Sequence, residues 1–215
     1  MRMSRWRRFW LCFALSVPLI GCSAGDQPDS QASADGRQSV IPEAVRQELV
    51  QLGIEDQEPR QGLTPERMQD TVFARNMLRG DSARTARLQA IVEEYGWPDS
   101  VRVGPEAAQA AFLILQHSPL HAFQKAMLPV LEDLVEQGAV PRDDSAMLID
   151  RVLMHEGLPQ RYGTQFTMED GRWVLHPVED EAGLEERRKT VGLPSMEEYM
   201  LMMEEFTKTP VVRQP

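Results

Sequence analysis

Residues 110–115, Ala110-Ala111-Phe112-Leu113-Ile114-Leu115, decide the fold of this chain. The run is apolar on every face of a helix, and a helix that is apolar all round is buried on all sides. We therefore expect the helix that opens at Pro105 to lie at the centre of the molecule. It ends in Gln116 and His117, two polar side chains at the end of a buried rod.

Helical periodicity continues on both sides of this central segment. Further helices are expected to begin near Pro42, Thr64-Pro65, Asp81, Ser118-Pro119, Asp143 or Asp144, Asp180 and Pro194. Gly80-Asp81 is expected to separate two of these helices, and Pro129 to kink the one that follows Ser118.

The periodicity changes late in the chain. Residues 162–178 are β-prone on either side of Glu169-Asp170-Gly171, a pattern typical of a hairpin. The predicted fold class is therefore mainly α, a compact helical domain with one late β-hairpin, at about residues 162–178, packed on it.

The first 22 residues have the composition of a secretory leader. Four arginines between residues 2 and 8 precede an apolar stretch over residues 9–20. That stretch is shorter than the roughly twenty apolar residues of a membrane span, although an uncleaved N-terminal anchor is the alternative reading. The stretch ends in Leu19-Ile20-Gly21-Cys22, which resembles the lipobox of bacterial lipoprotein precursors.

This resemblance implies transfer of a diacylglyceryl group to Cys22, cleavage before it, and acylation of the new amino group. Two or three acyl chains on one residue give near-permanent membrane attachment, because each buried methylene contributes roughly 0.8 kcal/mol. The expected partner is therefore a lipid bilayer, bound through acylated Cys22. Ser23 in the next position favours the outer membrane over the cell membrane, with the domain facing the periplasm.

The predicted domain organisation follows from these segments. Residues 1–21 are the signal peptide, and residues 22–42 are the lipidated cysteine and a flexible tether. The tether is polar, rich in small residues and aperiodic, and such a segment cannot bury enough apolar surface to fold. Residues 43–207 form a single mainly helical domain, and residues 208–215 form a tail.

Charge and cysteine content exclude several functions. Without its leader the chain has 19 basic and 33 acidic residues, a net charge of −14, which disfavours nucleic acid and anionic membrane surfaces. Cys12 is lost with the leader and Cys22 is acylated, so the domain has no thiol for a disulfide, for catalysis or for metal binding.

Much of the domain resembles a family of uncharacterised bacterial proteins. The resemblance runs from about Asp81 to Tyr199. It is carried by Glu94-Tyr95-Gly96-Trp97-Pro98, Gln116-His117, Asp150-Arg151-Val152, Pro159-Gln160, Tyr162-Gly163-Thr164-Gln165-Phe166, Pro177-Val178-Glu179-Asp180, Arg187-Arg188, Gly192-Leu193-Pro194 and Tyr199. It implies a shared fold and no particular activity.

Seven polar residues border the apolar helix and the hairpin and form the candidate site. They are Gln116, His117, Asp150, Arg151, Gln160, Tyr162 and Gln165. They could line a pocket, with His117 as acid or base and the glutamines bonding an amide or a sugar. The alternative is a buried polar network that fixes the hairpin on the helices, because buried polar groups must be paired with or without a ligand.

Other site chemistry is not indicated. His117 and His121 are four residues apart, but Ser118-Pro119 interrupts the helix that would align them, so no metal site is assigned. No nucleophile, phosphate-binding or dinucleotide motif occurs, and no cofactor is expected. Four methionines between residues 196 and 203 could form a docking face, although core packing is the more usual role of such a stripe.

The sequence therefore favours a lipid-anchored envelope protein whose domain binds or interacts with a partner, such as another envelope protein. An enzyme acting on an amide or glycan substrate, with His117 as acid or base, is the second hypothesis. A passive structural scaffold is the third.

The lipobox predicts a defined covalent state for the protein extracted from bacterial membranes. Intact-mass measurement should show the loss of residues 1–21 and the addition of acyl groups at Cys22. Cys22→Ser should lose the acyl mass. A wild-type chain that keeps Met1 and carries no acyl mass would contradict the assignment.

Overall fold

A computed structural model describes residues 40–61, 63–64, 67 and 69–213. The predicted signal peptide, Cys22 and most of the predicted tether lie outside the described residues. The helices are α2 (Glu43–Gln57), the short 3-10 helix η2 (Glu58–Arg60), α4 (Thr71–Tyr95), α5 (Ser100–Gln116), α6 (His121–Glu136), α7 (Arg142–His155), α8 (Leu184–Thr190) and α9 (Met196–Thr207). The strands are β1 (Phe166–Glu169), β2 (Arg172–Leu175) and β3 (Val211–Val212). The chain is mainly helical, with a small late sheet, as the sequence predicts.

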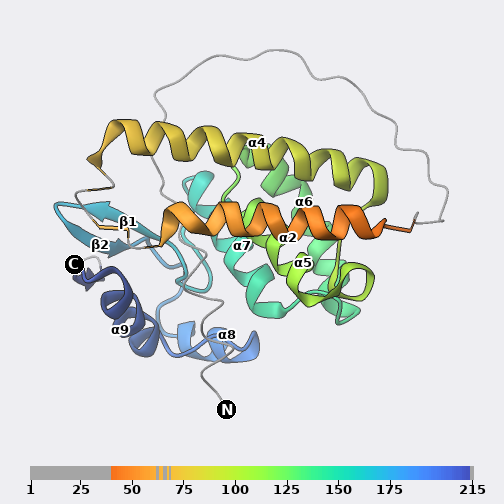
Figure 1. The fold of residues 1–215 in the computed structure, drawn as a ribbon. Coiled ribbons are helices and arrows are strands. Elements are labelled where there is room, and N and C mark those ends of the chain that lie inside the picture. The colour runs from red at the N-terminus through yellow and green to blue at the C-terminus, as the bar shows by residue number, and fades with distance from the viewer. Residues whose placement is uncertain (1–39, 62, 65–66, 68, 214–215) are drawn as a thin grey trace.

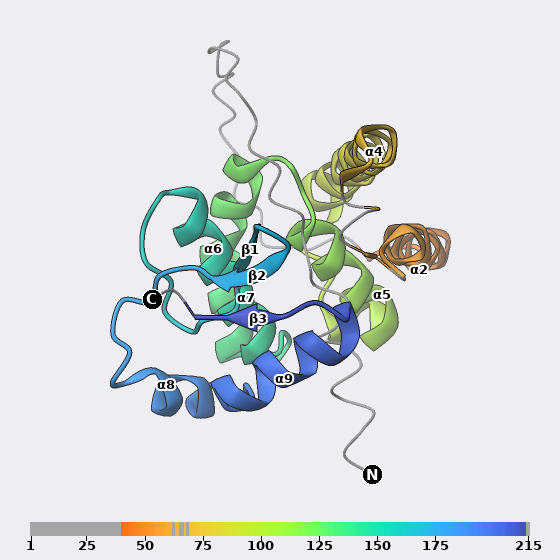
Figure 2. The same ribbon diagram turned by 90° about the vertical axis from the view of Figure 1, so that its left-hand side faces the viewer.

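Helix α5 lies at the centre of the helical part. It contacts α2 and α4 on one side and α6 and α7 on the other, and these layers can be followed in Figures 1 and 2. Gly104 has a φ of 78° and interrupts the first turn, so the regular helix begins at Pro105 as predicted. Residues 110–115 are all buried. The apolar run therefore occupies the position that its composition predicts.

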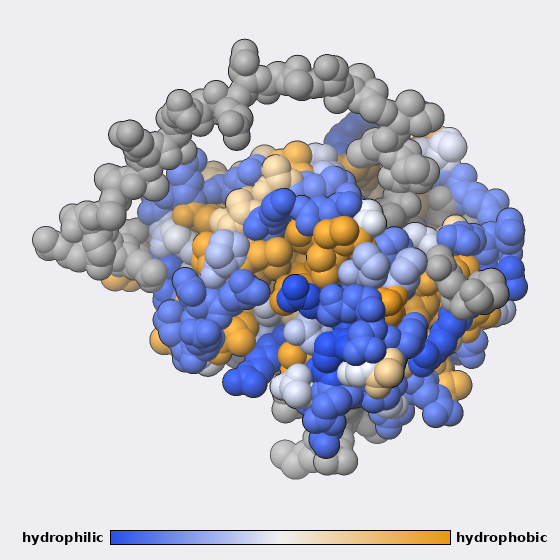
Figure 3. All heavy atoms as spheres, turned by 180° about the vertical axis from the view of Figure 1, so that it is seen from behind, coloured by the Kyte–Doolittle hydropathy of each residue, from blue (hydrophilic) through white to orange (hydrophobic). Residues whose placement is uncertain are grey.

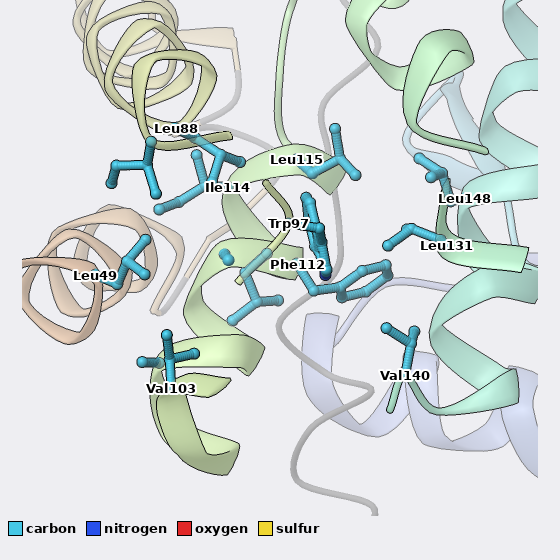
Figure 4. Packing of buried hydrophobic residues seen from close by; sticks show 14 of the residues in the cluster. Leu49, Leu88, Trp97, Val103, Phe112, Ile114, Leu115, Leu131, Val140 and Leu148 are labelled. Atoms are coloured by element: carbon cyan, nitrogen blue, oxygen red, sulfur yellow. The ribbon is translucent and has the colours of Figure 1, made fainter. Parts of the chain in front are cut away.

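The main core forms around this helix. Figure 4 shows Phe112, Ile114 and Leu115 of α5 among apolar side chains from the surrounding helices. These neighbours include Leu49 of α2, Leu88 of α4, Leu131 of α6 and Leu148 of α7, each with no solvent exposure. Each helix thus buries one stripe against α5, which is the usual way amphipathic helices are stabilised.

The predicted break at Gly80-Asp81 is wrong. Helix α4 continues through both residues for 25 residues, from its N-cap at Asp70 to Gly96, which has a φ of 77°. The Asp70 side chain accepts hydrogen bonds from the backbone nitrogens of the second and third residues of the helix, as a capping residue does. Asp81 is therefore a helix-interior residue and not a cap.

The start of α7 also differs from the prediction. Pro141 is the N-cap of α7, with no side-chain cap, and Asp143 and Asp144 lie in the first turn of the helix. There their negative charges interact favourably with the positive end of the helix dipole. The expected start at Thr64-Pro65 lies partly outside the described residues, and the Thr64 hydroxyl accepts a bond from the backbone nitrogen of Arg67.

The predicted hairpin is present, and the sheet has one strand more than expected. β1 and β2 pair antiparallel, with Phe166 opposite Leu175, around a turn in which Asp170 and Gly171 both have positive φ. β3 comes from the predicted tail and pairs parallel to β2, with Trp173 opposite Val211. The tail residues therefore complete the sheet instead of extending away from it.

A second apolar cluster joins the sheet to α8 and α9. Met196, Tyr199 and Met203 of α9 are buried in it with Phe166 and Trp173 of the sheet. The α9 methionines at these positions pack in the core, which is the more usual role of such a stripe. None of the helices in the described part of the chain is long and apolar enough to span a bilayer.

Helices α2 and α5 approach closely at Gly53. A Cβ built on Gly53 would lie 2.6 Å from the Cβ of Ala110. Gly53→Ala is therefore expected to destabilise the fold by about 1–3 kcal/mol through overpacking, despite the higher helix propensity of alanine. Chemical denaturation measures this change.

A compensating variant provides the control. Ala110→Gly removes the nearest atom that the new methyl group would meet and leaves the Cα of residue 110 at 3.2 Å. In that background Gly53→Ala should be much less destabilising than in the wild type. Equal destabilisation in both backgrounds would contradict the proposed steric contact.

Candidate functional site

Four buried charged side chains form a closed ring, which we call the ion ring. Asp56 lies in the last turn of α2, Arg60 lies in η2, and Asp81 and Arg84 lie one turn apart in α4. Arg60 Nη1 lies 3.2 Å from Asp56 Oδ1, and Arg60 Nη2 lies 2.8 Å from Asp81 Oδ1. Arg84 Nη2 lies 2.6 Å from Asp81 Oδ1, and Arg84 Nε closes the ring at 3.5 Å from Asp56 Oδ1. The ring ties α2 and η2 to the middle of α4.

His117 attaches to the ion ring from the end of α5. Its Nδ1 lies 2.7 Å from Oδ2 of Asp56, and both side chains are 1% exposed. Its Nε2 is buried and has no hydrogen-bond partner among the described residues. His117 thus contributes one paired and one unpaired ring nitrogen.

The charges in the cluster determine the protonation of this pair. Burial lowers the pKa of His117, and the nearby Arg60 acts in the same direction. Burial alone would raise the pKa of Asp56, but His117, Arg60 and Arg84 hold that pKa below its usual value. We therefore assign a neutral His117 whose Nδ1–H donates a hydrogen bond to an ionised Asp56. The lone pair of the imidazole then lies on Nε2.

The ion ring was missed from the sequence. Its four residues span positions 56 to 84, and Asp81 has the sequence context of a helix cap. A signal was nevertheless present, because Met77, Asp81, Arg84 and Leu88 repeat at helical spacing and are all buried on α4. A charged pair in phase with an apolar stripe indicates buried charges on a continuous helix.

A separate network surrounds Asp150 of α7. Its carboxylate accepts hydrogen bonds from the backbone nitrogens of Arg161, Tyr162 and Thr164, and from the Thr164 hydroxyl, at 2.7–3.2 Å. Burial raises the pKa of Asp150, whereas these four donors oppose that rise because they favour the carboxylate. Tyr162 takes part through its backbone, and Asp150 fixes the loop that leads into β1.

Two glutamines extend this network to the hairpin. Gln160 Nε2 donates to the carbonyls of Gln165 and His176, and Gln160 Oε1 accepts from the backbone nitrogen of Gln165. Gln165 Nε2 donates to the Thr164 hydroxyl at 2.9 Å. These contacts hold the loop and the residue before β1 against His176, directly after the end of β2.

The remaining predicted pair lies between α5 and α7. With its oxygen toward Arg151, the Gln116 side chain accepts hydrogen bonds from Nε at 2.8 Å and Nη2 at 3.2 Å. The seven predicted residues thus divide into three groups. Asp150, Tyr162 and the other two glutamines hold the loop, Gln116 and Arg151 pair with each other, and His117 joins the ion ring. The hydrogen bonds do not join His117 to the other six residues.

The other three histidines are His121, His155 and His176, and none of them takes part in the ion ring's ion pairs among the described residues. The rings of His121 and His155 stack with centroids 3.5 Å apart. Burial lowers the pKa of His155 to about 4, with His121, Arg151 and His176 acting in the same direction. Within the described part of the chain, no three His, Cys, Asp or Glu side chains are placed to hold a metal ion.

The chemistry of the two main networks differs. The Asp150 carboxylate accepts hydrogen bonds from four donors of the loop that it holds. These bonds account for its burial without a ligand. His117 has an acceptor at Nε2 without a described partner, and two guanidinium groups lie against the Asp56 carboxylate that holds its ring. A buried titratable group with a specific charge partner and a shifted pKa is a candidate for function. The candidate site is therefore the ion ring with His117.

Asp150→Asn tests the structural role of the second network. One carboxylate oxygen would be replaced by an NH₂ group, which cannot accept hydrogen bonds and would face the N–H and O–H donors of the loop. The variant should therefore lose about 3 kcal/mol of stability in urea unfolding. Asp133→Asn, at an exposed position on α6, is the matched control and should change stability by less than about 0.5 kcal/mol. Similar effects of the two variants would mean that the four hydrogen bonds contribute little.

Comparison with known proteins gives a family but no activity. No curated protein and no solved structure matches the chain. Residues 43–211 match a family of unknown function, DUF6624, and this stretch contains the ion ring, the Asp150 network, the β1–β2 hairpin and the first residue of β3. Because the match covers most of the chain, the protein belongs to the DUF6624 family.

Proposed function

We propose that this DUF6624 protein is a lipid-anchored protein of the bacterial cell envelope whose helical domain binds a ligand at the ion ring. The anchoring is supported by the lipobox at residues 19–22 and by the polar stretch that follows it. The folded family domain begins at Glu43, so about twenty residues separate it from Cys22. This separation allows the domain to meet an envelope partner while the acyl chains stay in the bilayer.

The observation that carries the binding proposal is the unpaired Nε2 of His117. Buried polar atoms in native proteins nearly always have a partner, and an exception calls for a ligand, a water molecule or a catalytic role. The Asp56 bond fixes the orientation of the imidazole, so the Nε2 lone pair has a fixed direction. The site is therefore preorganised to accept one hydrogen bond.

The ligand chemistry follows from the atoms around this position. A group that binds Nε2 must supply an O–H or N–H donor, because the nitrogen is an acceptor. Arg60 Nε also makes no hydrogen bond with a described residue, so the same cluster holds an unused donor for an oxygen of the ligand. A hydroxyl, carboxamide or similar small polar group has this combination. Because His117 is only 4% exposed, binding requires local opening of the surrounding side chains.

A second candidate function uses the same atoms for catalysis. A neutral histidine that is held by a carboxylate at Nδ1 can take a proton from water or a hydroxyl at Nε2. The guanidinium groups of Arg60 and Arg84 would stabilise an oxyanion formed nearby. This arrangement favours hydrolysis of an amide or glycosidic bond over chemistry that requires a protein nucleophile.

His117→Asn separates these functions from a purely structural role. An asparagine amide can still donate to Asp56 while it removes Nε2, so the fold should be retained. In native mass spectrometry of protein isolated from its own membranes, the wild type should carry a small-molecule adduct that His117→Asn lacks. His121→Asn, at an exposed histidine outside the ion ring, should keep the adduct.

The outcomes distinguish the hypotheses. If both His117→Asn and the wild type carry the same adduct, or if neither does, binding at His117 is wrong. If incubation with the glycan and peptide polymer of the envelope releases products with the wild type and His121→Asn, but not with His117→Asn, the enzymatic function replaces simple binding. If His117→Asn only lowers the unfolding temperature, the histidine belongs to a structural scaffold.

A further inference from the structure

The outer face of α4 carries opposite charges toward its two ends. Arg75 and Arg79 lie in the first half of the helix, and Glu93 lies in its last turn. All three are exposed, and exposed alanines separate them at Ala83, Ala86 and Ala90. At 3.6 residues per turn, Arg75, Arg79, Ala86 and Glu93 point within about 40° of one another. They therefore form one continuous stripe, which we call the α4 stripe.

The charges of the α4 stripe have no ion-pair partner among the described residues. In contrast, Arg87 on the neighbouring side of the same helix pairs with Glu48 of α2, and Asp81 and Arg84 pair in the ion ring. The position of Glu93 is also unfavourable for the isolated helix, because a negative charge in the last turn opposes the helix dipole. Neither intramolecular pairing nor helix stability accounts for these charges.

We propose that the α4 stripe is the contact surface for a second copy of this chain, with the two α4 helices antiparallel. Arg79 and Glu93 are each seven residues from Ala86. A two-fold axis at Ala86 therefore brings Arg79 of each copy opposite Glu93 of the other. Arg75 lies about one turn beyond Arg79 and extends the positive end. A parallel arrangement would instead set like charges against each other.

The same stripe has the shape that such a contact needs. Alanine side chains at and around the axis allow two helices to approach closely, since they place no long side chain between the backbones. In both ribbon views α4 lies at the outer edge of the helical layer, with α2 and α5 on its inner side (Figures 1 and 2). Nothing in the described part of the chain packs on the stripe.

Charge and size favour this occupant over others. The predicted mature chain is strongly acidic, so an anionic membrane is repelled, and self-association needs the local opposite charges that the stripe supplies. A 25-residue helix is about 37 Å long. One helix face of this length gives an interface near the lower end of the roughly 1,200–2,000 Å² typical of stable complexes, so we expect a dissociation constant of about micromolar.

A larger apolar surface lies elsewhere and does not identify its occupant. Hydrophobic residues gather in the middle of the face opposite α2 and α4 (Figure 3). Nothing in the described part of the structure shows what would cover that surface. The α4 stripe is more informative because its charges are complementary to themselves after a two-fold rotation.

Charge reversal tests the dimer in the full-length chain. In detergent solution, light scattering of the wild type at about 100 µM should give the mass of a dimer, with monomer at low concentration or high salt. Arg79→Glu and Glu93→Arg should each weaken the dimer at least about tenfold, because each sets like charges together twice per dimer. The double variant restores both pairs with exchanged signs and should dimerise like the wild type.

A cross-link tests the antiparallel geometry. Under mild oxidation Ala86→Cys should form a disulfide between the two new cysteines, identified by peptide mapping. Ala126→Cys, at an exposed alanine of α6, is the matched control and should remain uncross-linked. A wild type that stays monomeric, a double variant that does not recover, or equal cross-linking at both positions would overturn the proposal. The assays do not depend on ligand binding, so their failure leaves the His117 proposal unaffected.

Discussion

A helix whose C-terminal half is buried on all sides, as residues 110–116 of α5 are, must also end inside the protein. The last carbonyls of such a helix, and the polar side chains beside them, cannot be solvated and need partners from the chain. In this protein α5 meets the requirement with a single amide. Gln124 Nε2 donates to the carbonyls of Leu115, Gln116 and Ser118, and Gln124 has no solvent exposure. The buried end of α5 is thereby stabilised from the first turn of α6.

The two polar side chains at the same helix end form hydrogen bonds with charged residues. Gln116 pairs with Arg151, and His117 pairs with Asp56. Asp56 is then a buried carboxylate that itself needs positive charge, which Arg60 and Arg84 supply. Asp81 balances the second of these arginines, so the ring contains two negative and two positive groups. Burial is the main reason that the pKa of His117 is lowered, and the positive charge of Arg60 acts in the same direction.

The parts of this arrangement differ in how far the sequence predicts them. The central position of residues 110–115 follows from composition, because only burial satisfies a helix that is apolar all round. The hairpin follows from its turn residues, and the group around Asp150 is predicted because its members lie close together in the chain. The ion ring was not predicted, since its members are separated by up to 61 residues from His117. The partner of a buried charge is decided by tertiary packing, and the helical phase of Asp81 and Arg84 was hidden by the apparent break at Gly80.

That apparent break matters for both surfaces of α4. Two separate helices would allow the segment before Gly80 and the segment after it to point in different directions. One continuous helix fixes their phase, so the inner face presents Asp81 and Arg84 to the ion ring while the outer face aligns Arg79 with Glu93. Arg84 and Ala86 lie within one turn of each other on these opposite faces. A partner that fixes the outer face of α4 therefore also restrains Arg84, which lies beside Asp56. A movement that opens the His117 site without breaking the α4 contact must leave α4 in place, because a shift of α4 would disturb the ion ring and the α4 stripe together.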